Sequence, residues 1–139
     1  MKKIFIFLFV SIPFIACSQE IVSLKEKFED YFLLGATINQ EDYQLIDKDE
    51  KILEIVYKEF NSVTPENSMK WMHSHPEYSK FTFSNAQKIT DFAKDNDMYL
   101  LGHTLVWHNQ VPDYVSQIKE KTKFNLHIKN HIFQLVTRF

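Results

Sequence analysis

Imidazole, indole and amide side chains follow an apolar run near the middle of the chain. The run from Met98 to Trp107 contains His103, and Gln110 follows it within three residues. Buried strands are filled by Val, Leu and Ile, so polar and aromatic groups at a strand end favour a surface that holds a polar, ring-shaped ligand. The alternative is that His103 and Trp107 are ordinary core side chains.

A second cluster ends an earlier apolar run. Glu66, Asn67, Lys70 and Trp71 supply an acceptor, an amide, a cation and an aromatic ring within six residues. Sugars present hydroxyls around apolar ring faces, so a sugar site needs such donors and acceptors beside aromatic platforms. The structural alternative is an exposed Glu66–Lys70 ion pair at i,i+4, worth on the order of 0.3 kcal/mol, with Trp71 in the core.

Helices and strands alternate along the chain. We expect helices over 23–32, 50–59, 85–95 and 124–139, and strands over 33–38, 60–64 and 98–107. Ser23 with Glu26 forms a capping box, and Asp49 and Ser84 are expected helix caps. The strands are nearly continuous apolar runs, which predicts parallel βαβ units with strands buried on both faces. Both clusters then lie at the C-terminal ends of adjacent strands, where β/α barrels place their sites. His103 and Trp107 share one face if their strand stays regular.

The first residues have the pattern of a targeting signal. Two lysines precede an apolar run over residues 4–16 that is short for a membrane span, and Cys17, the single cysteine, follows directly. Residues 1–17 resemble a bacterial lipoprotein signal peptide, in which Cys17 carries the lipid. Secretion by cleavage after Ser18 is the alternative. Either interpretation predicts a secreted protein or a lipoprotein of the cell surface or outer membrane, and a lone cysteine excludes an internal disulfide.

Composition narrows the classes of partner. The 139 residues are 45% hydrophobic and 15% aromatic, as expected of a globular domain. The net charge of −2 becomes −4 without the two leader lysines, with 14 basic against 18 acidic residues. A chain of this charge is not expected to bind nucleic acid. The length is normal for one domain but short for a β/α barrel, which needs about 250 residues.

The two clusters together carry a family resemblance. The run Phe-Asn-Ser-Val-Thr-Pro-Glu-Asn-Ser-Met-Lys-Trp at 60–71 and the run Gly-His-Thr-Leu-Val-Trp-His at 102–108 are specific in this order and at this distance. With them, residues 33–139 resemble the N-terminal portion of glycoside hydrolase family 10, the endo-1,4-β-xylanases. Gln87 and Tyr114 depart from the residues usual in that family, and neither departure changes the assignment.

The resemblance implies a fold, an activity and a substrate. The fold would be α/β, with residues 18–139 forming the first three β/α units of an incomplete (β/α)8 barrel, before strand four. The activity would be hydrolysis of internal β-1,4 bonds of xylan with retention of configuration. Xylan or xylo-oligosaccharides are the implied partners, no cofactor is implied, and the full-length protein is expected to be a monomer. The residues implied to bind the sugar are Glu66, Asn67, Lys70, His103, Trp107 and Gln110.

The resemblance also implies that the cleaving groups are absent. Retaining hydrolysis needs two carboxyl groups about 5–5.5 Å apart. In the family these are glutamates at the ends of strands four and seven, which places both beyond Phe139. Glu66 has a binding role in the family, and Asp113 occupies the position of a loop residue without a catalytic role. We therefore expect the chain to bind the glycone side of the substrate without cleaving it. The alternative is a non-catalytic remnant that binds xylan or oligosaccharides.

The remaining histidines suggest no metal site. His127 and His131 stand at i,i+4 on the last predicted helix, a zinc-binding spacing, but no Glu follows His127 as a metalloprotease motif requires. We expect both on a helix face that contacts solvent or a neighbouring helix. His73 and His75 lie in a polar segment and are expected to be solvated.

Overall fold

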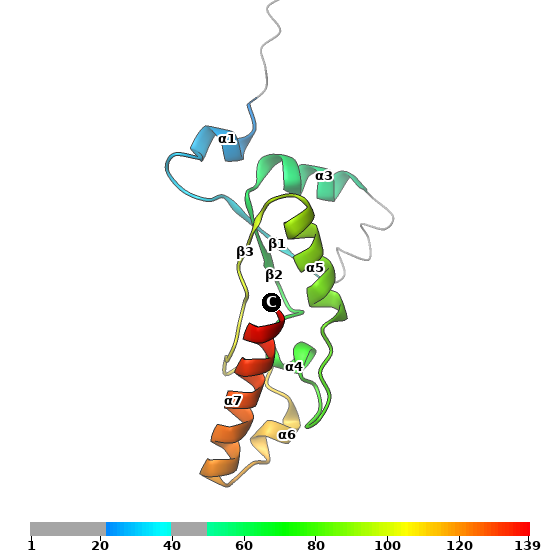
Figure 1. Ribbon diagram of the computed structural model, residues 1–139, viewed down its shortest axis with the longest axis vertical. Helices are drawn as coiled ribbons and strands as arrows, with labels where there is room; N and C mark the ends of the chain where they lie inside the picture. The colour runs from blue at the N-terminus through cyan, green and yellow to red at the C-terminus, as the bar shows by residue number, and fades with distance from the viewer. Residues whose placement is uncertain (1–21, 40–49) are drawn as a thin grey trace, which may run out of the picture.

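A three-stranded parallel sheet organises the protein. The computed structural model describes residues 22–39 and 50–139 (Figure 1). The predicted signal peptide, Cys17 and the predicted cap Asp49 lie outside these residues. The strands are β1 (Gly35–Ile38), β2 (Ser62–Pro65) and β3 (Tyr99–Leu100), in the order β1-β2-β3, and both pairings are parallel. The predicted parallel βαβ arrangement is confirmed.

The third strand is far shorter than predicted, because its ladder on β2 stops. Tyr99 N–H donates to Asn61 O at 2.9 Å and Leu101 N–H donates to Val63 O at 2.9 Å, so alternate residues of β2 face β3. Pro65 is the next residue in that series, and proline has no N–H to donate to the Leu101 carbonyl. Residues 101–111 therefore leave the sheet as an irregular segment. The expectation of a regular strand over 98–107, with His103 and Trp107 on one face, is wrong.

The helices follow the predicted order, with differences at their ends. Their bounds are α1 (Leu24–Phe28), α3 (Glu50–Glu59), α4 (Trp71–Ser74), α5 (Ser84–Asp95), α6 (Asp113–Ser116) and α7 (Lys121–Arg138). The capping box of Ser23 and Glu26 is present, with Glu26 Oε2 accepting from Ser23 N at 2.9 Å. α1 ends early because it buries no side chain, and a helix without a buried face gains little from growing. Ser84 is not the cap of α5: the helix begins at Ser84, and Phe83 is the N-cap.

One face of the sheet packs against helices. The main core joins Ile38 and Val63 of the sheet to Val56 of α3 and Ile89 of α5. The residues that alternate with them along the strands, and so face the other side of the sheet, are half-buried or exposed: Gly35, Thr37, Ser62 and Thr64. The prediction of strands buried on both faces is therefore wrong for the described residues, where α3 and α5 cover a single face (Figure 1).

A second, smaller core attaches α7 below the sheet in Figure 1. Leu135 of α7 packs with Met69, which follows β2, and with Ala86 of α5. The Phe83 and Phe139 rings meet edge to face, with centroids 5.7 Å apart. No helix of the described ranges 22–39 and 50–139 is both long and apolar enough to cross a membrane.

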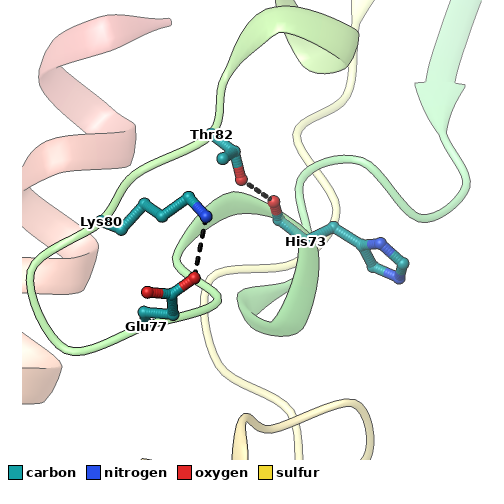
Figure 2. Close-up of polar contacts among 4 residues, drawn as sticks. All are labelled: His73, Glu77, Lys80 and Thr82. Atoms are coloured by element: carbon teal, nitrogen blue, oxygen red, sulfur yellow. Dashed lines mark hydrogen bonds and ion pairs between the residues drawn. The ribbon is translucent and has the colours of Figure 1, made fainter.

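The segment between α4 and α5 is a closed loop beside α7. Figure 2 shows its two ties: Lys80 Nζ pairs with Glu77 Oε1 at 2.8 Å, and the Thr82 hydroxyl donates to the His73 carbonyl. Thr82 N–H also donates to Ser74 O at 2.9 Å. The short helix α4 before this loop was not predicted from the sequence. The loop brings Tyr78 close to α7, where the Tyr78 and His127 ring centroids are 4.2 Å apart.

Candidate functional site

The two predicted clusters meet at the C-terminal ends of β2 and β3. Asn67 Oδ1 accepts from Lys70 Nζ at 2.9 Å and from Gln110 Nε2 at 3.4 Å. Asn67 and Lys70 follow β2, whereas Gln110 belongs to the segment that follows β3. One amide oxygen thus joins the two segments, as expected for neighbouring parallel strands whose carboxyl ends lie at one edge.

Trp107 completes this cluster. Lys70 Nζ lies 5.2 Å from the Trp107 ring centroid, within the range of a cation–π contact. His103 lies next to Trp107, and their ring centroids are 6.4 Å apart. Trp107 is 37% exposed, so the interpretation of this residue as core is wrong. Trp71 is only 3% exposed, which confirms it as a core residue.

Lys70 points into the cluster. Only 9% of the residue is exposed, and its ammonium contacts Asn67 and Trp107. No ion pair joins it to Glu66 among the described residues, so the simple i,i+4 interpretation is wrong. Glu66 is exposed, and its N–H donates to Ile38 O at 2.9 Å, which places it at the end of β1 as well as β2.

Gln110 presents an unpaired acceptor. Its side chain is half-buried, and its Oε1 is buried without a hydrogen-bond partner in the described part of the chain. Its backbone is in the left-handed region, with φ 52°, which side-chain-bearing residues adopt rarely. The Gln110 carbonyl accepts from Met72 N–H at 2.9 Å. Gln110 therefore combines a strained backbone with a buried, unpaired amide oxygen next to Asn67, and such strain is common at binding sites.

A layer of aromatic rings supports the cluster. Trp71 Nε1 donates to the Tyr114 hydroxyl at 3.0 Å, and that hydroxyl donates to the His75 carbonyl at 3.3 Å. Burial raises the pKa of Tyr114, while the hydrogen bond from Trp71 acts in the opposite direction. The His131 ring stacks on Trp71, with centroids 4.2 Å apart and planes 5° from parallel. The segment after β2 therefore rests on α6 and α7.

One histidine of this layer, His75, was expected to be solvated, and that prediction is wrong because the residue is fully buried. His131 is also fully buried and His127 nearly so, and both lie on a face of α7 that contacts neighbouring helices, as predicted. Burial lowers the pKa of His75, and the hydrogen bond to Tyr78 O partly opposes that effect. Burial also lowers the pKa of His131 from 6.5 to about 4, against the opposing effect of the hydrogen bond to Leu105 O. The i,i+4 spacing of His127 and His131 correctly indicated one face of a helix. The aromatic rings that contact this face come from α4, α6 and the loop after α4.

The arrangement can bind a neutral, hydroxyl-rich ligand. It offers a half-exposed indole face, an ammonium, two amides, an imidazole and a carboxylate. Within residues 22–39 and 50–139 no three His, Cys, Asp or Glu side chains are grouped so as to hold a metal ion. Glu66 follows β2 and Asp113 begins α6, and both of these acidic side chains are exposed.

Comparison with known proteins decides the family. Residues 23–139 match the profile of glycosyl hydrolase family 10. The chain belongs to this family. It is 44% identical over 94 residues to endo-1,4-beta-xylanase A of Caldicellulosiruptor saccharolyticus, covering 68% of this chain and 26% of that protein. It is 40% identical over 124 residues to a beta-1,4-xylanase of Dictyoglomus thermophilum, covering 89% of this chain and 33% of that protein.

Solved structures support the same assignment. The family 10 chain aligns with the crystal structure of xylanase 10B from Thermotoga petrophila in complex with xylobiose at a TM-score of 0.77 and 37% identity. The alignment covers 86% of this chain and 37% of that one. The chain thus spans about a third of the length of such relatives. The predicted fold class, an incomplete β/α barrel, is confirmed by these barrel-shaped neighbours.

Proposed function

We propose that the chain provides the glycone-side sugar-binding half of an endo-1,4-β-xylanase, an enzyme that cleaves internal β-1,4 bonds of xylan with retention. The observation that carries the proposal is the joining of Asn67, Lys70, Trp107 and Gln110 into one contact network from two strand ends. Relatives named as xylanases, at 40–44% identity, supply the class of substrate.

Each side chain has a role suited to xylose. The Trp107 ring is exposed enough to hold the apolar face of one sugar, with the Lys70 ammonium lying over the ring. The ammonium donates to sugar hydroxyls, and the half-buried Gln110, held on Asn67 Oδ1 through its Nε2, lines the same sugar. We assign Glu66 and His103, both exposed beside this network, to further hydroxyls, with Glu66 able to accept two at once.

The binding half does not perform the cleavage in this proposal. Retaining hydrolysis proceeds through an acid/base carboxyl and a nucleophilic carboxylate about 5–5.5 Å apart. We assign neither role to Glu66 or to Asp113, which starts α6. The six binding residues hold and orient the sugar on one side of the bond, and the two glutamates implied by the family resemblance act from outside these 139 residues.

Titration of the 139-residue chain with xylotriose tests the proposal. We expect saturable binding without release of reducing sugar above a blank, and no binding of the α-linked maltotriose. Trp107→Ala and Lys70→Met should each weaken binding about ten-fold, as the loss of a stacking platform or a charged donor does. Tyr99→Ala and Lys94→Met remove exposed side chains of the same types from β3 and α5, and should leave the affinity unchanged.

Two results would contradict parts of this proposal. Xylan turnover by the pure chain would show that it contains working carboxylates. Absence of xylotriose binding would show that the network is structural only. Binding without turnover is also what a non-catalytic xylan-binding remnant would show. Adding the separately produced remainder of a family 10 barrel separates the two, because only an enzyme half gains activity.

We also propose that residues 1–17 direct export and that Cys17 carries a lipid. The support is the order of charged, apolar and cysteine residues in the sequence. The exported protein would act on the cell surface as a monomer with xylan as its partner. Labelling bacteria that express the chain with a fatty-acid analogue should mark the wild type and not Cys17→Ser. Equal labelling, or release of the unmodified wild type into the medium, would contradict the lipid anchor.

A further inference from the structure

One buried imidazole touches both segments that supply the sugar-binding network. His131 of α7 has no exposed surface. Its ring stacks on Trp71, the residue directly after Lys70. Its Nε2 lies 2.9 Å from the Leu105 carbonyl, midway between His103 and Trp107.

The hydrogen bond fixes the state of the imidazole. A carbonyl oxygen only accepts, so Nε2 carries the proton and donates it to Leu105 O. Nδ1 is buried without a hydrogen-bond partner among the described residues, and a second proton there would find no acceptor. The ring is therefore neutral, with its one N–H directed at the segment after β3.

That segment has few other anchors. All residues from Leu101 to Asn109 except Thr104 are exposed, and none of the nine is a buried core residue that would fix the segment. The ladder on β2 ends at Leu101, and the next backbone tie is Met72 N–H to Gln110 O at 2.9 Å. Between these two points, the bond from His131 holds the middle of the segment.

We infer that His131 is a positioning residue for the sugar-binding network. Through its hydrogen bond to Leu105 it sets the place of His103 and Trp107, and its stack on Trp71 holds the imidazole where it can make that bond. It contacts no sugar itself. This inference rests on the proposed function for its effect on affinity, but its effect on Trp107 is independent of any sugar.

The test compares three variants of the full chain. His131→Phe keeps a ring on Trp71 and loses the donor, whereas His131→Gln keeps an N–H donor and loses the ring. His127→Phe is the matched control, because His127 is buried on the same helix, one turn earlier, and its ring contacts Tyr78 and Tyr114 instead. The readouts are the indole N–H resonance of Trp107, assigned with Trp107→Phe, and xylotriose affinity.

The hydrogen bond to Leu105 should control both readouts. In His131→Phe we expect a shifted or broadened Trp107 resonance and an affinity about ten-fold weaker, the loss of one well-placed hydrogen bond. His131→Gln and the His127→Phe control should keep the wild-type resonance and bind within about two-fold of wild type.

Contrary results separate the possible failures. A folded His131→Phe with the wild-type resonance and affinity overturns the positioning role. If His131→Phe does not fold, a folded His131→Gln that loses the resonance overturns the inference as stated, because it shows that the ring and not the hydrogen bond to Leu105 places Trp107. If the wild type binds no xylotriose, the proposed function fails, while the Trp107 resonance still decides the role of His131.

Discussion

Acid should weaken this fold through His131, in a pH range set by its buried position. In the folded chain the His131 pKa is about 4, against 6.5 for an ordinary histidine. The folded state binds the proton less readily than the unfolded state does. The stability that depends on a neutral His131 is therefore fully present above about pH 6.5, and it is lost progressively as the pH falls toward 4.

The two pKa values set the magnitude. The difference between 6.5 and about 4 corresponds to about 3 kcal/mol of lost stability once the proton is bound in both states. At pH 4.5 the folded chain is only partly protonated at His131, so not all of this loss is reached. We therefore expect a loss of about 2 kcal/mol between pH 7.5 and 4.5.

Among the titratable groups near His131, His75 adds to the loss of stability in acid and Tyr114 stays neutral. His75, with its ring centroid 5.6 Å from that of His131, has a pKa that burial also lowers, so its protonation adds to the loss. His127, one turn away on α7, lies nearer to Tyr78 and Tyr114. The pKa of Tyr114 is raised, which keeps its hydroxyl protonated throughout this range.

Urea unfolding at pH 7.5 and 4.5 measures the effect. The comparison is between wild type and His131→Phe, which retains the stack on Trp71 but cannot titrate. Carboxyl groups titrate in both chains, so the difference between their pH-dependent losses, about 2 kcal/mol, isolates His131. Ile89→Val is a control, because it weakens the core between the sheet and α3 and α5 without changing a titratable group. It should keep the wild-type pH dependence of stability. Parallel pH profiles for wild type and His131→Phe would refute the reasoning.

Three further predictions concern stability at neutral pH, each measured by urea or thermal unfolding. Ser23→Ala removes the capping box of α1 and should cost about 1 kcal/mol, and an unchanged midpoint would show that α1 adds nothing to the fold. Ile89→Ala removes a fully buried side chain and should cost about 3 kcal/mol; less than half of that would indicate a loosely packed core. Tyr114→Phe leaves the buried Trp71 N–H unpaired and should cost about 2 kcal/mol, more than the exposed control Tyr99→Phe.

The order of helices and strands could be predicted from the sequence because the signals for it are local. The capping box at Ser23 and the apolar periodicity of residues 50–59 and 85–95 each depend on near neighbours along the chain. The meeting of Asn67 with Gln110 followed from a general property of parallel strands, since the segments that carry them leave neighbouring strands at the same edge, although Gln110 lies well beyond the end of β3.

Features that depend on distant partners were not predictable in the same way. The length of β3 depends on which N–H groups β2 offers, and the effect of Pro65 becomes visible only once the register with Leu101 is known. The burial of His75 and His131 depends on how α7 crosses α4, which no periodicity encodes. Pro65 was the one signal in the sequence for the short β3. The sequence held no comparable signal for the burial of His75 and His131.

The strand order has a practical consequence for work in solution. In the described residues β1 and β3 each have a neighbour on one side only, so each offers free backbone donors and acceptors along its outer border. Such borders can pair with those of another molecule. The exposed side chains of Tyr99, in β3, and of Leu101, directly after it, would add apolar area to such an intermolecular contact. Affinities and unfolding curves should therefore be collected at several dilutions, and the values that no longer change with concentration describe the single chain.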